Sequence, residues 1–441
     1  MIYTLSKFNE FIFFEKAVVG VNTNTRMLFK IGKEKYNLLL ENKDNLSILE
    51  KEHPILFSLM KKLGIIVEDD NLEQTLLLQN RQIVFNTKSY RLTINPTLNC
   101  NFSCWYCYET HTKKIMSKEA IDATLLFIKN IIKEKKISEF QLDWFGGEPL
   151  LCFKNVMVPL CTEAKKICDM YGVKFISGIT TNGYLITKDM IPFFKEYNYR
   201  SFQITLDGIR DVHNSIRFTH NNRGSFDKIV ENVSSLAKEL KPENLALRIN
   251  YTAETFTQIA EIIPMFSKEI RPYITVLLQQ VWQDKDNNKI KAEDIEDLKY
   301  KFEEVGFRIE KNIFNLRNYT CYADLFYQAV INYDGRVFKC TARNFEEEDE
   351  DGLLSEDGDI IWSSKKLAKK ISKATFENEK CMNCKYLPLC FGPCSQKIST
   401  IETPKDFDKY CFMGGIKESL EYVMAKFYNS EKALASLLDY R

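Results

Sequence analysis

The sequence predicts an α/β protein whose centre is an open, partial barrel of six strand–helix units, a (β/α)6 TIM-like arrangement. Three observations lead to this prediction. Strand-like and helical patterns alternate between residues 90 and 309. Cys100, Cys104 and Cys107 follow the first of these strands directly. After residue 310 the sequence becomes loop-rich, with spaced cysteines. The predicted units span residues 1–85, 86–310 and 311–441.

Residues 1–85 combine short strands with small helices, which predicts a winged-helix-like module. The alternative is a plain N-terminal extension that packs on the next domain. Strand-like runs lie at 11–14, 18–21, 27–31 and 64–67, and helical patterns lie at 33–41 and 54–63.

The central unit alternates strands and helices along its whole length. Strands are expected at 91–95, 141–145, 174–180, 201–206, 245–251 and 273–280, and helices at 118–134, 156–170, 188–197, 225–240, 255–270 and 292–309. Six units in a row predict a parallel sheet with right-handed crossovers. A closed barrel needs eight, so this one is expected to stay open, with its functional residues at the carboxyl ends of the strands.

The last unit has few long periodic runs. Residues 330–338 are typical of a hairpin that turns at Asp334 and Gly335, and residues 413–437 of a terminal helix. The acidic run 346–351 is predicted to be a solvated loop, because six like charges repel one another. The alternative for this run is contact with a basic peptide.

The charge balance gives no support for a polyanionic partner. The 441 residues contain 61 Lys and Arg and 60 Asp and Glu, a net charge of +1, so neither nucleic acid nor an anionic membrane is expected. We see no secretory signal and no apolar run long enough to span a bilayer. A cytoplasmic protein is therefore expected.

Thirteen cysteines need an explanation. Disulfide bonds are a weak explanation in a reducing cytosol, and an odd number of cysteines cannot pair completely within one chain. Cys152, Cys161 and Cys168 are expected to be buried structural residues. The other ten fall in spaced groups, which indicates metal binding: Cys100, Cys104 and Cys107; Cys321 and Cys340; Cys381, Cys384, Cys390, Cys394 and Cys411.

The spacing Cys100-x3-Cys104-x2-Cys107 suits an iron–sulfur cluster. Three thiolates hold three irons of a [4Fe–4S] cluster and leave the fourth iron open to another ligand. The alternatives are three unrelated buried cysteines or a partial zinc site. With this spacing the chain resembles the radical SAM enzymes, in which S-adenosylmethionine (SAM) occupies the open iron. The resemblance covers roughly residues 90–412.

Further motifs at strand ends carry the same resemblance. It implies that the Gly146-Gly147-Glu148 turn holds the amino group of SAM, with the Glu148 carboxylate facing the ammonium. For each polar residue of the set the alternative is helix capping or turn chemistry. The SAM contacts that the resemblance implies are Tyr106, Gly146, Gly147, Glu148, Thr181, Asn182, Thr205 and Arg217.

The cysteine spacing of the last unit resembles the SPASM extension of radical SAM peptide-modifying enzymes, which carries two auxiliary [4Fe–4S] clusters. A zinc ribbon on Cys381, Cys384, Cys390 and Cys394 is the alternative. No cysteine lies at 315–319, so the cluster on Cys321 would have an open iron or a non-cysteine ligand. The resemblance implies Cys381, Cys384, Cys390 and Cys411 for one cluster and Cys321, Cys340 and Cys394 for the other.

Together these resemblances imply a radical SAM/SPASM maturase with three [4Fe–4S] clusters and SAM. Its partners would be a ribosomally made precursor peptide with a leader and a reductant such as flavodoxin or ferredoxin. The product would be a thioether or carbon–carbon crosslink, and residues 1–85 would bind the leader by adding a strand to a sheet edge.

Two alternatives remain at this point. One is a formylglycine-forming or quinone-cofactor maturase of the same superfamily. Sulfatase-maturing relatives carry an aspartate base where this chain has Thr341, which disfavours formylglycine formation because a base must reach its proton. The other is a zinc-stabilised peptide-binding protein without chemistry.

Overall fold

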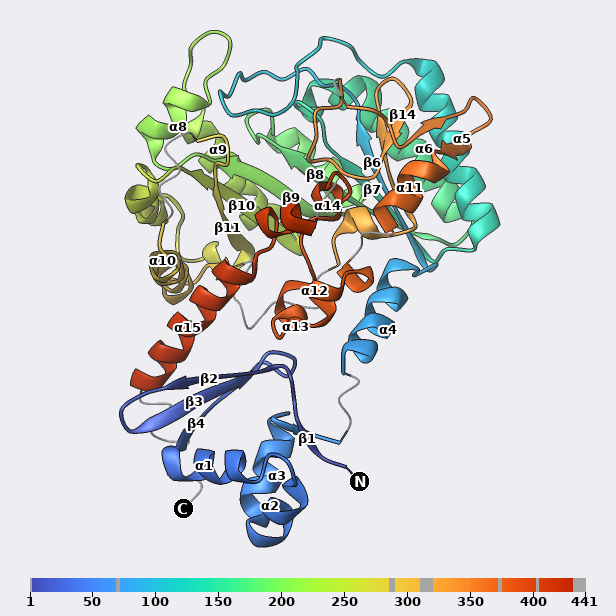
Figure 1. Cartoon of the computed structure of the whole chain (residues 1–441). Coiled ribbons are helices and arrows are strands. Elements are labelled where there is room, and N and C mark those ends of the chain that lie inside the picture. Colours follow the sequence, from blue (N-terminus) through green and yellow to red (C-terminus); the bar gives the residue numbers. More distant parts are fainter. Residues whose placement is uncertain are drawn as a thin grey trace.

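Three regions of the chain are visible in the computed structural model (Figure 1). A small N-terminal unit lies apart from a large α/β core, and the C-terminal residues contact both. The structure describes residues 2–68, 72–284, 290–309, 320–346, 348–371, 375–401 and 404–430. No helix in these ranges is both long enough and apolar enough to cross a membrane.

The N-terminal unit combines a three-stranded antiparallel sheet with three helices, in agreement with the predicted mixture of short strands and small helices. Val18, Leu39, Leu49 and Met60 form part of its buried core. Its sheet contains β2 (Asn9–Phe13), β3 (Ala17–Asn22) and β4 (Met27–Gly32), its helices are α1 (Lys33–Glu41), α2 (Leu46–Glu52) and α3 (Pro54–Lys62), and β1 (Thr4–Leu5) pairs with β5 (Ile66–Val67). The sequence pattern does not predict helix α2 or the following α4 (Leu72–Val84).

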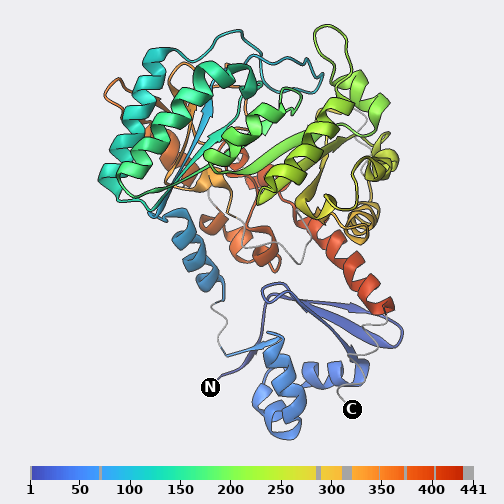
Figure 2. The same cartoon turned by 180° about the vertical axis from the view of Figure 1, so that it is seen from behind.

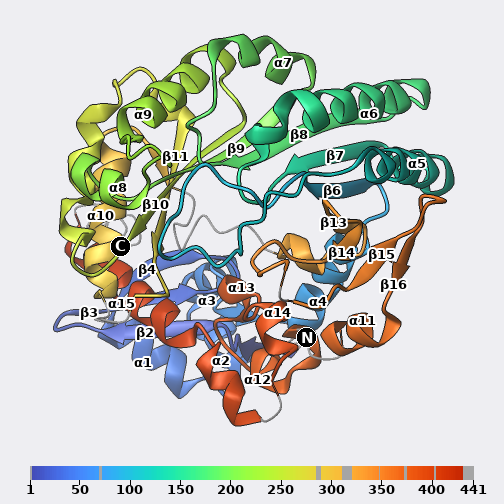
Figure 3. The same ribbon diagram turned by 90° about the horizontal axis from the view of Figure 1, so that it is seen from above.

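Six parallel strands form the core sheet in chain order: β6 (Ser89–Asn95), β7 (Glu139–Trp144), β8 (Lys174–Thr181), β9 (Tyr199–Leu206), β10 (Asn244–Tyr251) and β11 (Ile274–Gln280). Figure 3 shows them as an open arc. The short strand β12 (Arg308–Ile309) extends one side, and β13 (Gln328–Asn332) pairs in parallel with β6 on the other. These two do not pair with each other within the described residues, so the predicted partial barrel is confirmed.

The two faces of this sheet differ in chemistry. Leu92, Leu142, Ile204 and Leu247 belong to the main apolar core, under helices that cover the outer face (Figures 2 and 3). Side chains alternate along a strand, so the inner face carries mainly polar residues, including Thr93, Asn95, Gln141, Asp143, Gln203, Thr205, Arg248 and Asn250. The covering helices are α5 (Lys118–Lys135), α6 (Val158–Met170), α7 (Ile191–Glu196), α9 (Phe226–Ser235) and α10 (Ala292–Glu304).

Several helices predicted for the core are shorter than expected. Residues 255–270 form a 3₁₀ helix over Phe256–Met265 that contains Pro264, because proline removes a backbone donor and disrupts an α-helix. Helix α10 ends at Glu304 rather than at residue 309, and Gly306 with φ of +99° turns the chain into β12. Helix α9 changes at Ser235 to a π-helical turn over Leu236–Leu240.

The predicted hairpin at 330–338 is confirmed. Strand β13 pairs with β14 (Arg336–Phe338), and Gly335 has φ of +82° in the turn. The sheet then continues through β15 (Gly352–Leu354) to β16 (Ile360–Trp362). The core sheet thus runs on into the third predicted unit. The boundary predicted near residue 310 lies outside the described residues, and the division into units stays a prediction.

Short helices follow and lie on the open side of the arc (Figure 3): α11 (Ser364–Ile371), α12 (Glu379–Met382), α13 (Leu387–Cys390) and α14 (Ser395–Ile398). Helix α15 (Met413–Asn429) then runs toward the N-terminal sheet (Figure 1). The predicted terminal helix is confirmed to Asn429, and its predicted end at 437 lies outside the described residues.

The N-terminal sheet shares a buried core with the C-terminal region. Val19 and Val21 pack with Tyr386, Leu389 and Leu420. Polar contacts reinforce this interface: the Tyr386 hydroxyl donates to Glu10 Oε2 at 2.5 Å, and the Thr23 hydroxyl donates to the Lys385 carbonyl at 2.6 Å. The N-terminal unit therefore contacts the segment between Cys384 and Cys390.

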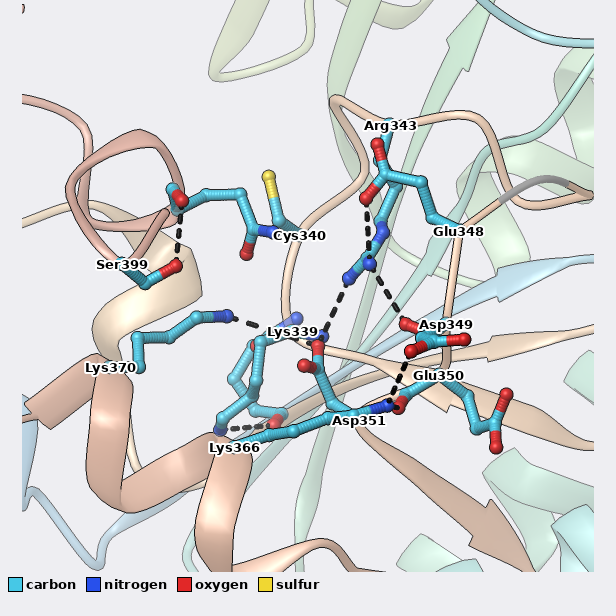
Figure 4. A network of polar contacts seen from close by, with 12 residues as sticks. Lys339, Cys340, Arg343, Glu348, Asp349, Glu350, Asp351, Lys366, Lys370 and Ser399 are labelled. Atoms are coloured by element: carbon cyan, nitrogen blue, oxygen red, sulfur yellow. Dashed lines mark hydrogen bonds and ion pairs between the residues drawn. The ribbon is translucent and has the colours of Figure 1, made fainter. Parts of the chain in front are cut away.

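The acidic run at 346–351 is less solvated than predicted, and for Asp351 the prediction is wrong. Asp351 is 6% exposed and accepts from the Lys339 backbone N–H at 2.8 Å and from Arg343 Nη1 at 3.2 Å. Figure 4 shows it between Arg343 and Lys370. These cations offset the cost of burying its charge. The position of residue 347 is outside the described residues.

Candidate active site

The loop after β6 carries Cys100, Cys104 and Cys107. The first two thiols are partly buried and the third is exposed, and the Cys107 N–H donates to the Cys104 carbonyl at 3.0 Å. Burial raises the pKa of Cys100 to about 12, with the nearby Glu148 and Cys104 adding to the shift. Burial raises the pKa of Cys104 and Cys107 too, and Cys107 adds to the shift of Cys104. The structure thus brings the three predicted ligands together.

The Gly146-Gly147 turn packs directly on this loop. Gly146 has φ of +103°, and a Cβ there would lie 2.4 Å from the Thr97 carbonyl oxygen. A Cβ on Gly147 would lie 2.3 Å from the Asn99 carbonyl oxygen. Both glycines are needed for this close backbone approach, so the turn and the cysteine loop form one unit.

The Glu148 carboxylate points into the protein. It is fully buried and accepts from the Leu150 N–H at 3.0 Å, the Thr181 hydroxyl at 2.8 Å and the Asn182 N–H at 2.8 Å. Burial raises its pKa to about 7, although these donors oppose the shift. The side chain therefore links the ends of β7 and β8, whereas the resemblance implied that it faces the ammonium of SAM.

Asn182 connects the β8 end to the cysteine loop. Its Nδ2 donates to Asn101 Oδ1 at 2.7 Å and lies 3.9 Å from Cys100 Sγ. The buried Nδ2 of Asn101 has no hydrogen-bond partner among the described residues, and an unpaired buried donor is costly. A ligand atom beside Cys100 would satisfy it, which agrees with the predicted cofactor site.

Tyr106 is the centre of a polar cluster. Its hydroxyl lies 2.7 and 2.6 Å from the two carboxylate oxygens of Asp207, and accepts from Arg217 Nη2 at 2.6 Å and from Asn250 Nδ2 at 2.9 Å. The Tyr106 carbonyl accepts from Gln283 Nε2 at 2.5 Å. Arg217 pairs with Asp207 at 2.7 Å, so this predicted SAM contact already has a carboxylate partner.

His213 holds Asp207 and Arg217 in place through their backbones, directly for Asp207 and through Ser225 for Arg217. Its Nδ1 accepts from the Asp207 N–H at 3.1 Å, its Nε2 lies 2.9 Å from the Ser225 hydroxyl, and that hydroxyl donates to the Arg217 carbonyl at 2.5 Å. The ring is fully buried, and burial with the nearby Arg217 charge lowers its pKa to about 3. His213 is therefore neutral and carries its proton on Nε2.

The C-terminal thiols influence one another in two groups, and the ligand sets that the resemblance implies stay predictions. Cys321 is influenced electrostatically by Cys340 and Cys394, and burial raises its pKa to about 12. Cys381 is influenced by Cys390, Cys384 and Cys411, and burial raises its pKa likewise. Cys152, Cys161 and Cys168 are buried in the main core, as predicted.

The segment after Cys340 lies against the first cysteine loop. The Tyr108 hydroxyl donates to the Thr341 carbonyl at 3.3 Å. Asn344 exchanges two hydrogen bonds with Thr110, at 3.1 and 2.9 Å. The first thiol group and the Cys340 group are therefore neighbours although more than two hundred residues separate them in sequence.

The grouped thiols have the ligand type that iron–sulfur clusters need. Within the described ranges, no three His, Cys, Asp or Glu side chains converge on a point where one ion could bind. In a cluster each thiolate binds its own iron, so the ligands stand further apart. The grouped thiols and the unpartnered Asn101 amide both suit such a group.

Comparison with known proteins decides the family. Residues 94–263 match the sequence model of the radical SAM superfamily, and this match includes the cysteine loop, the Gly-Gly turn and the Asp207–Arg217 pair. The chain contains a radical SAM domain. It is a radical SAM enzyme, and enzymes of this superfamily bind SAM and a [4Fe–4S] cluster. This domain favours an enzyme over the zinc-stabilised binding protein.

Individual relatives extend the likeness beyond that region. The cysteine-type anaerobic sulfatase-maturating enzyme of Clostridium novyi (strain NT) is 24% identical over 375 residues, which cover 79% of this chain and 99% of that protein. The structure of native anSMEcpe with bound AdoMet and Cp18Cys peptide has a TM-score of 0.54 at 18% identity, covering 77% and 98%. Streptococcus suis SuiB bound to S-adenosylmethionine has a TM-score of 0.51 at 15% identity, covering 91% and 98%. These two structural likenesses show a shared fold.

Sequence reasoning missed several polar residues of this radical SAM site. Asp207 lies two positions after Thr205 and His213 four positions before Arg217, but the resemblance gave neither a role. Asn250 lies at the end of β10 without any motif. Its contact with Tyr106, 144 positions away in the chain, depends on how the strands are placed.

Proposed function

We propose that this radical SAM enzyme is a maturase that modifies a ribosomally made peptide and closes a crosslink within it. Cys100, Cys104 and Cys107 hold the cluster that binds SAM. Gly146, Gly147, Thr181, Asn182, Thr205, Arg217 and Tyr106 line the pocket of SAM, and Glu148 holds the ends of β7 and β8 in place.

When bound, the cluster and SAM would supply radical chemistry, the abstraction of one hydrogen atom from the peptide. The protein supplies position and environment. Tyr106, Asp207 and Arg217 form a hydrogen-bonded cluster beside the cysteine loop. The polar inner face of the sheet offers donors and acceptors to a peptide backbone, which a purely apolar barrel would not do.

The observation that carries this proposal is the contact between the first cysteine loop and the segment after Cys340. Closing a ring removes two hydrogens from the peptide: one leaves as a hydrogen atom, and the other as a proton and an electron. That electron needs an acceptor near the reacting carbon. We assign auxiliary [4Fe–4S] clusters to Cys321, Cys340 and Cys394 and to Cys381, Cys384, Cys390 and Cys411, and the first of these groups is adjacent to the SAM loop.

The N-terminal unit is proposed to bind the leader of the precursor. In the described residues, β2 and β4 each pair only with β3, so both outer strands have backbone groups available for another strand. Strand addition at such an edge is a common way to bind an extended peptide. The leader would then be held beside the segment of Cys384 and Cys390.

A second candidate is formylglycine formation on a protein, as in sulfatase maturation. The likeness over 99% of the Clostridium novyi maturating enzyme favours it. Thr341 disfavours it, because threonine replaces the aspartate base expected after Cys340. The Thr341 hydroxyl lies 2.6 Å from the Tyr322 hydroxyl, and neither group is a base at neutral pH.

Mass spectrometry separates the two candidates. The anaerobically reconstituted enzyme, SAM and dithionite are incubated with candidate precursor peptides, and 5′-deoxyadenosine is quantified alongside peptide mass. A crosslinked product loses two hydrogens and keeps every sulfur, and a thioether also loses its reactivity with iodoacetamide. Formylglycine made from serine loses two hydrogens as well, but it is an aldehyde that reacts with hydroxylamine. Loss of sulfur from a cysteine, or a product that forms an oxime with hydroxylamine, would identify formylglycine formation and overturn the crosslinking proposal.

A further inference from the structure

The inner face of the sheet carries a cation, Arg248, that forms no ion pair within the described residues, although Asp207 acts on it at longer range. Arg248 lies on β10 between Thr205 of β9 and Leu277 of β11. Its Nε donates to Asn250 Oδ1 at 2.9 Å. Among the residues that the structure describes, no carboxylate lies within ion-pair distance of its guanidinium.

Three other cations of the sheet and site are paired. Arg91 lies 2.7 Å from Asp143, Lys174 lies 2.7 Å from Glu139, and Arg217 lies 2.7 Å from Asp207. Burial lowers the pKa of Arg248, because the surroundings disfavour its charged form. A partly buried guanidinium without an ion-pair partner is costly, and an anionic ligand would remove that cost.

Arg248 and Arg217 influence different side chains of the site, apart from Tyr106 and Asp207, which interact with both. The charge of Arg217 affects the pKa of all three thiols of the cysteine loop. Arg248 instead interacts most strongly with the phenols of Tyr108 and Tyr106, and Tyr108 donates to the Thr341 carbonyl. Arg248 is therefore near Tyr108, which contacts the segment after Cys340, and it adjoins Tyr106 through Asn250, whereas Arg217 contacts Tyr106 directly.

From this geometry we propose that Arg248 binds a carboxylate of the peptide substrate, an aspartate or glutamate side chain that enters the barrel. The inference rests on the proposed peptide-modifying function and names a feature of its substrate. A guanidinium presents a fork of donors that matches a carboxylate. Arg248 would thereby determine which segment of the peptide lies between the two cysteine groups.

The test is an internal competition. Wild-type enzyme is incubated anaerobically with SAM, dithionite and a synthetic peptide library in which glutamate and glutamine are equimolar at each position around one cysteine and one tyrosine. The ratio of glutamate to glutamine in peptides that have lost two hydrogens is read by mass spectrometry. Because both peptides compete in one reaction, the ratio does not depend on how active a variant is.

Wild type should favour glutamate by at least about tenfold, because hydrogen bonds to charged groups are the strong ones. Arg248→Gln should reduce the ratio to about one, Arg248→Lys should retain part of it, and Arg248→Glu should favour lysine in a matched lysine–glutamine library. Lys174→Gln is the control: it removes a paired cation from the same sheet and should leave the ratio unchanged.

Two outcomes overturn the inference. An unchanged ratio in Arg248→Gln shows that the peptide carboxylate binds elsewhere. If the ratio is unchanged and the Kd for SAM rises about tenfold, the carboxylate belongs to SAM. Failure of the proposed function has a different signature: wild type cleaves SAM but modifies no library peptide, and the inference then fails with it.

Discussion

Side chains assigned to the cofactor site also hold the strand ends of the protein together. Tyr106 belongs to the cysteine loop, yet its hydroxyl contacts Asp207 and Asn250 at two neighbouring strand ends and Arg217, which follows helix α8 (Arg210–Ile216). Glu148, expected to face the cofactor, accepts hydrogen bonds from the β8 end. The electrostatics around the SAM pocket are therefore set by buried pairs within the protein as much as by side chains that would touch the cofactor.

Replacing Cys104 by alanine should abolish reductive cleavage of SAM, because the cluster loses one of its three thiolates. We expect 5′-deoxyadenosine to fall to background and the cluster's EPR signal to stop responding to added SAM. Cys168→Ala is the matched control, since this thiol lies in the apolar core and should leave both signals intact. Robust 5′-deoxyadenosine from the Cys104 variant would refute the ligand assignment.

The buried His213 should make stability depend on pH. Its folded pKa of about 3 lies below the unfolded value near 6.5, so the unfolded chain takes up a proton first. Stability from this group is complete above about pH 6.5 and declines by about 1.4 kcal/mol per unit as pH falls toward 3.

Chemical denaturation between pH 7 and pH 5 measures this effect. In His213→Gln the decline should be shallower by about 2 kcal/mol over that range, since glutamine can accept from the Asp207 N–H but does not titrate. His53→Gln, in the N-terminal unit, serves as the control and should keep the wild-type slope. Equal slopes for wild type and the His213 variant would contradict the assignment of His213 as a buried neutral group.

Residue identities are easier to predict from the sequence than residue contacts. All ten grouped cysteines can be recognised, because spacing within a short segment reports ligation directly. The hydrogen-bond partners of Arg217 and Glu148 cannot be recognised from the sequence, because only the tertiary arrangement brings Asp207 to Arg217 and Thr181 to Glu148. That Arg248 forms no ion pair within the described residues is equally hidden in the sequence, since whether a cation is paired depends on which strands are neighbours.

Among the structural elements, the Gly146-Gly147 turn joins β7 to the cysteine loop. Gly146→Ala should destabilise the fold by about 1–3 kcal/mol and weaken SAM binding, because a Cβ with φ of +103° is strained and would lie 2.4 Å from the Thr97 carbonyl oxygen. Denaturant unfolding and a SAM binding titration measure the two effects.

Gly414→Ala is the control for this change. This glycine lies in the first turn of α15, and a Cβ added there would meet no atom from another part of the described chain within 4 Å. Alanine is favoured over glycine in a helix by about 1 kcal/mol, so the variant should be as stable as wild type or more so. If both variants behave alike, the close backbone packing of the Gly-Gly turn has no energetic importance.

The strands of the core can be predicted almost to the residue, whereas the helices are predicted less well. Buried parallel strands such as β8 are continuous apolar runs with clear limits. The pattern of residues 255–270 is equally apolar, but Pro264 excludes a regular α-helix. In helix α4 the buried apolar side chain is Leu76, so the helical period of this segment carries little signal.

On the scale of the whole molecule, the N-terminal unit and the C-terminal cysteine region form one packed assembly. Val21→Asp should destabilise both, because it buries a charge against Tyr386 and Leu420. We expect a loss of more than about 3 kcal/mol and fewer irons per chain after reconstitution, measured by thermal unfolding and iron analysis.

Met27→Asp is the control for this interface, since Met27 is 40% exposed on β4 and a charge there stays hydrated. It should retain wild-type stability and iron content. A Val21 variant with normal iron and thermal stability would mean that the N-terminal unit is only loosely attached to the rest of the chain.

The pairing of β13 with β6 constrains how a peptide can react. Strand β6 leads into the loop of Cys100, and β13 leads through its hairpin to Cys340, with five residue pairs joining the two strands. Adjacent strands lie about 4.8 Å apart and form a stiff ladder. The ladder therefore holds the start of the Cys100 loop beside the start of the hairpin that leads to Cys340. Under the proposed assignment, a peptide that reacts between the two thiol groups would have to fit a separation that the fold sets in advance.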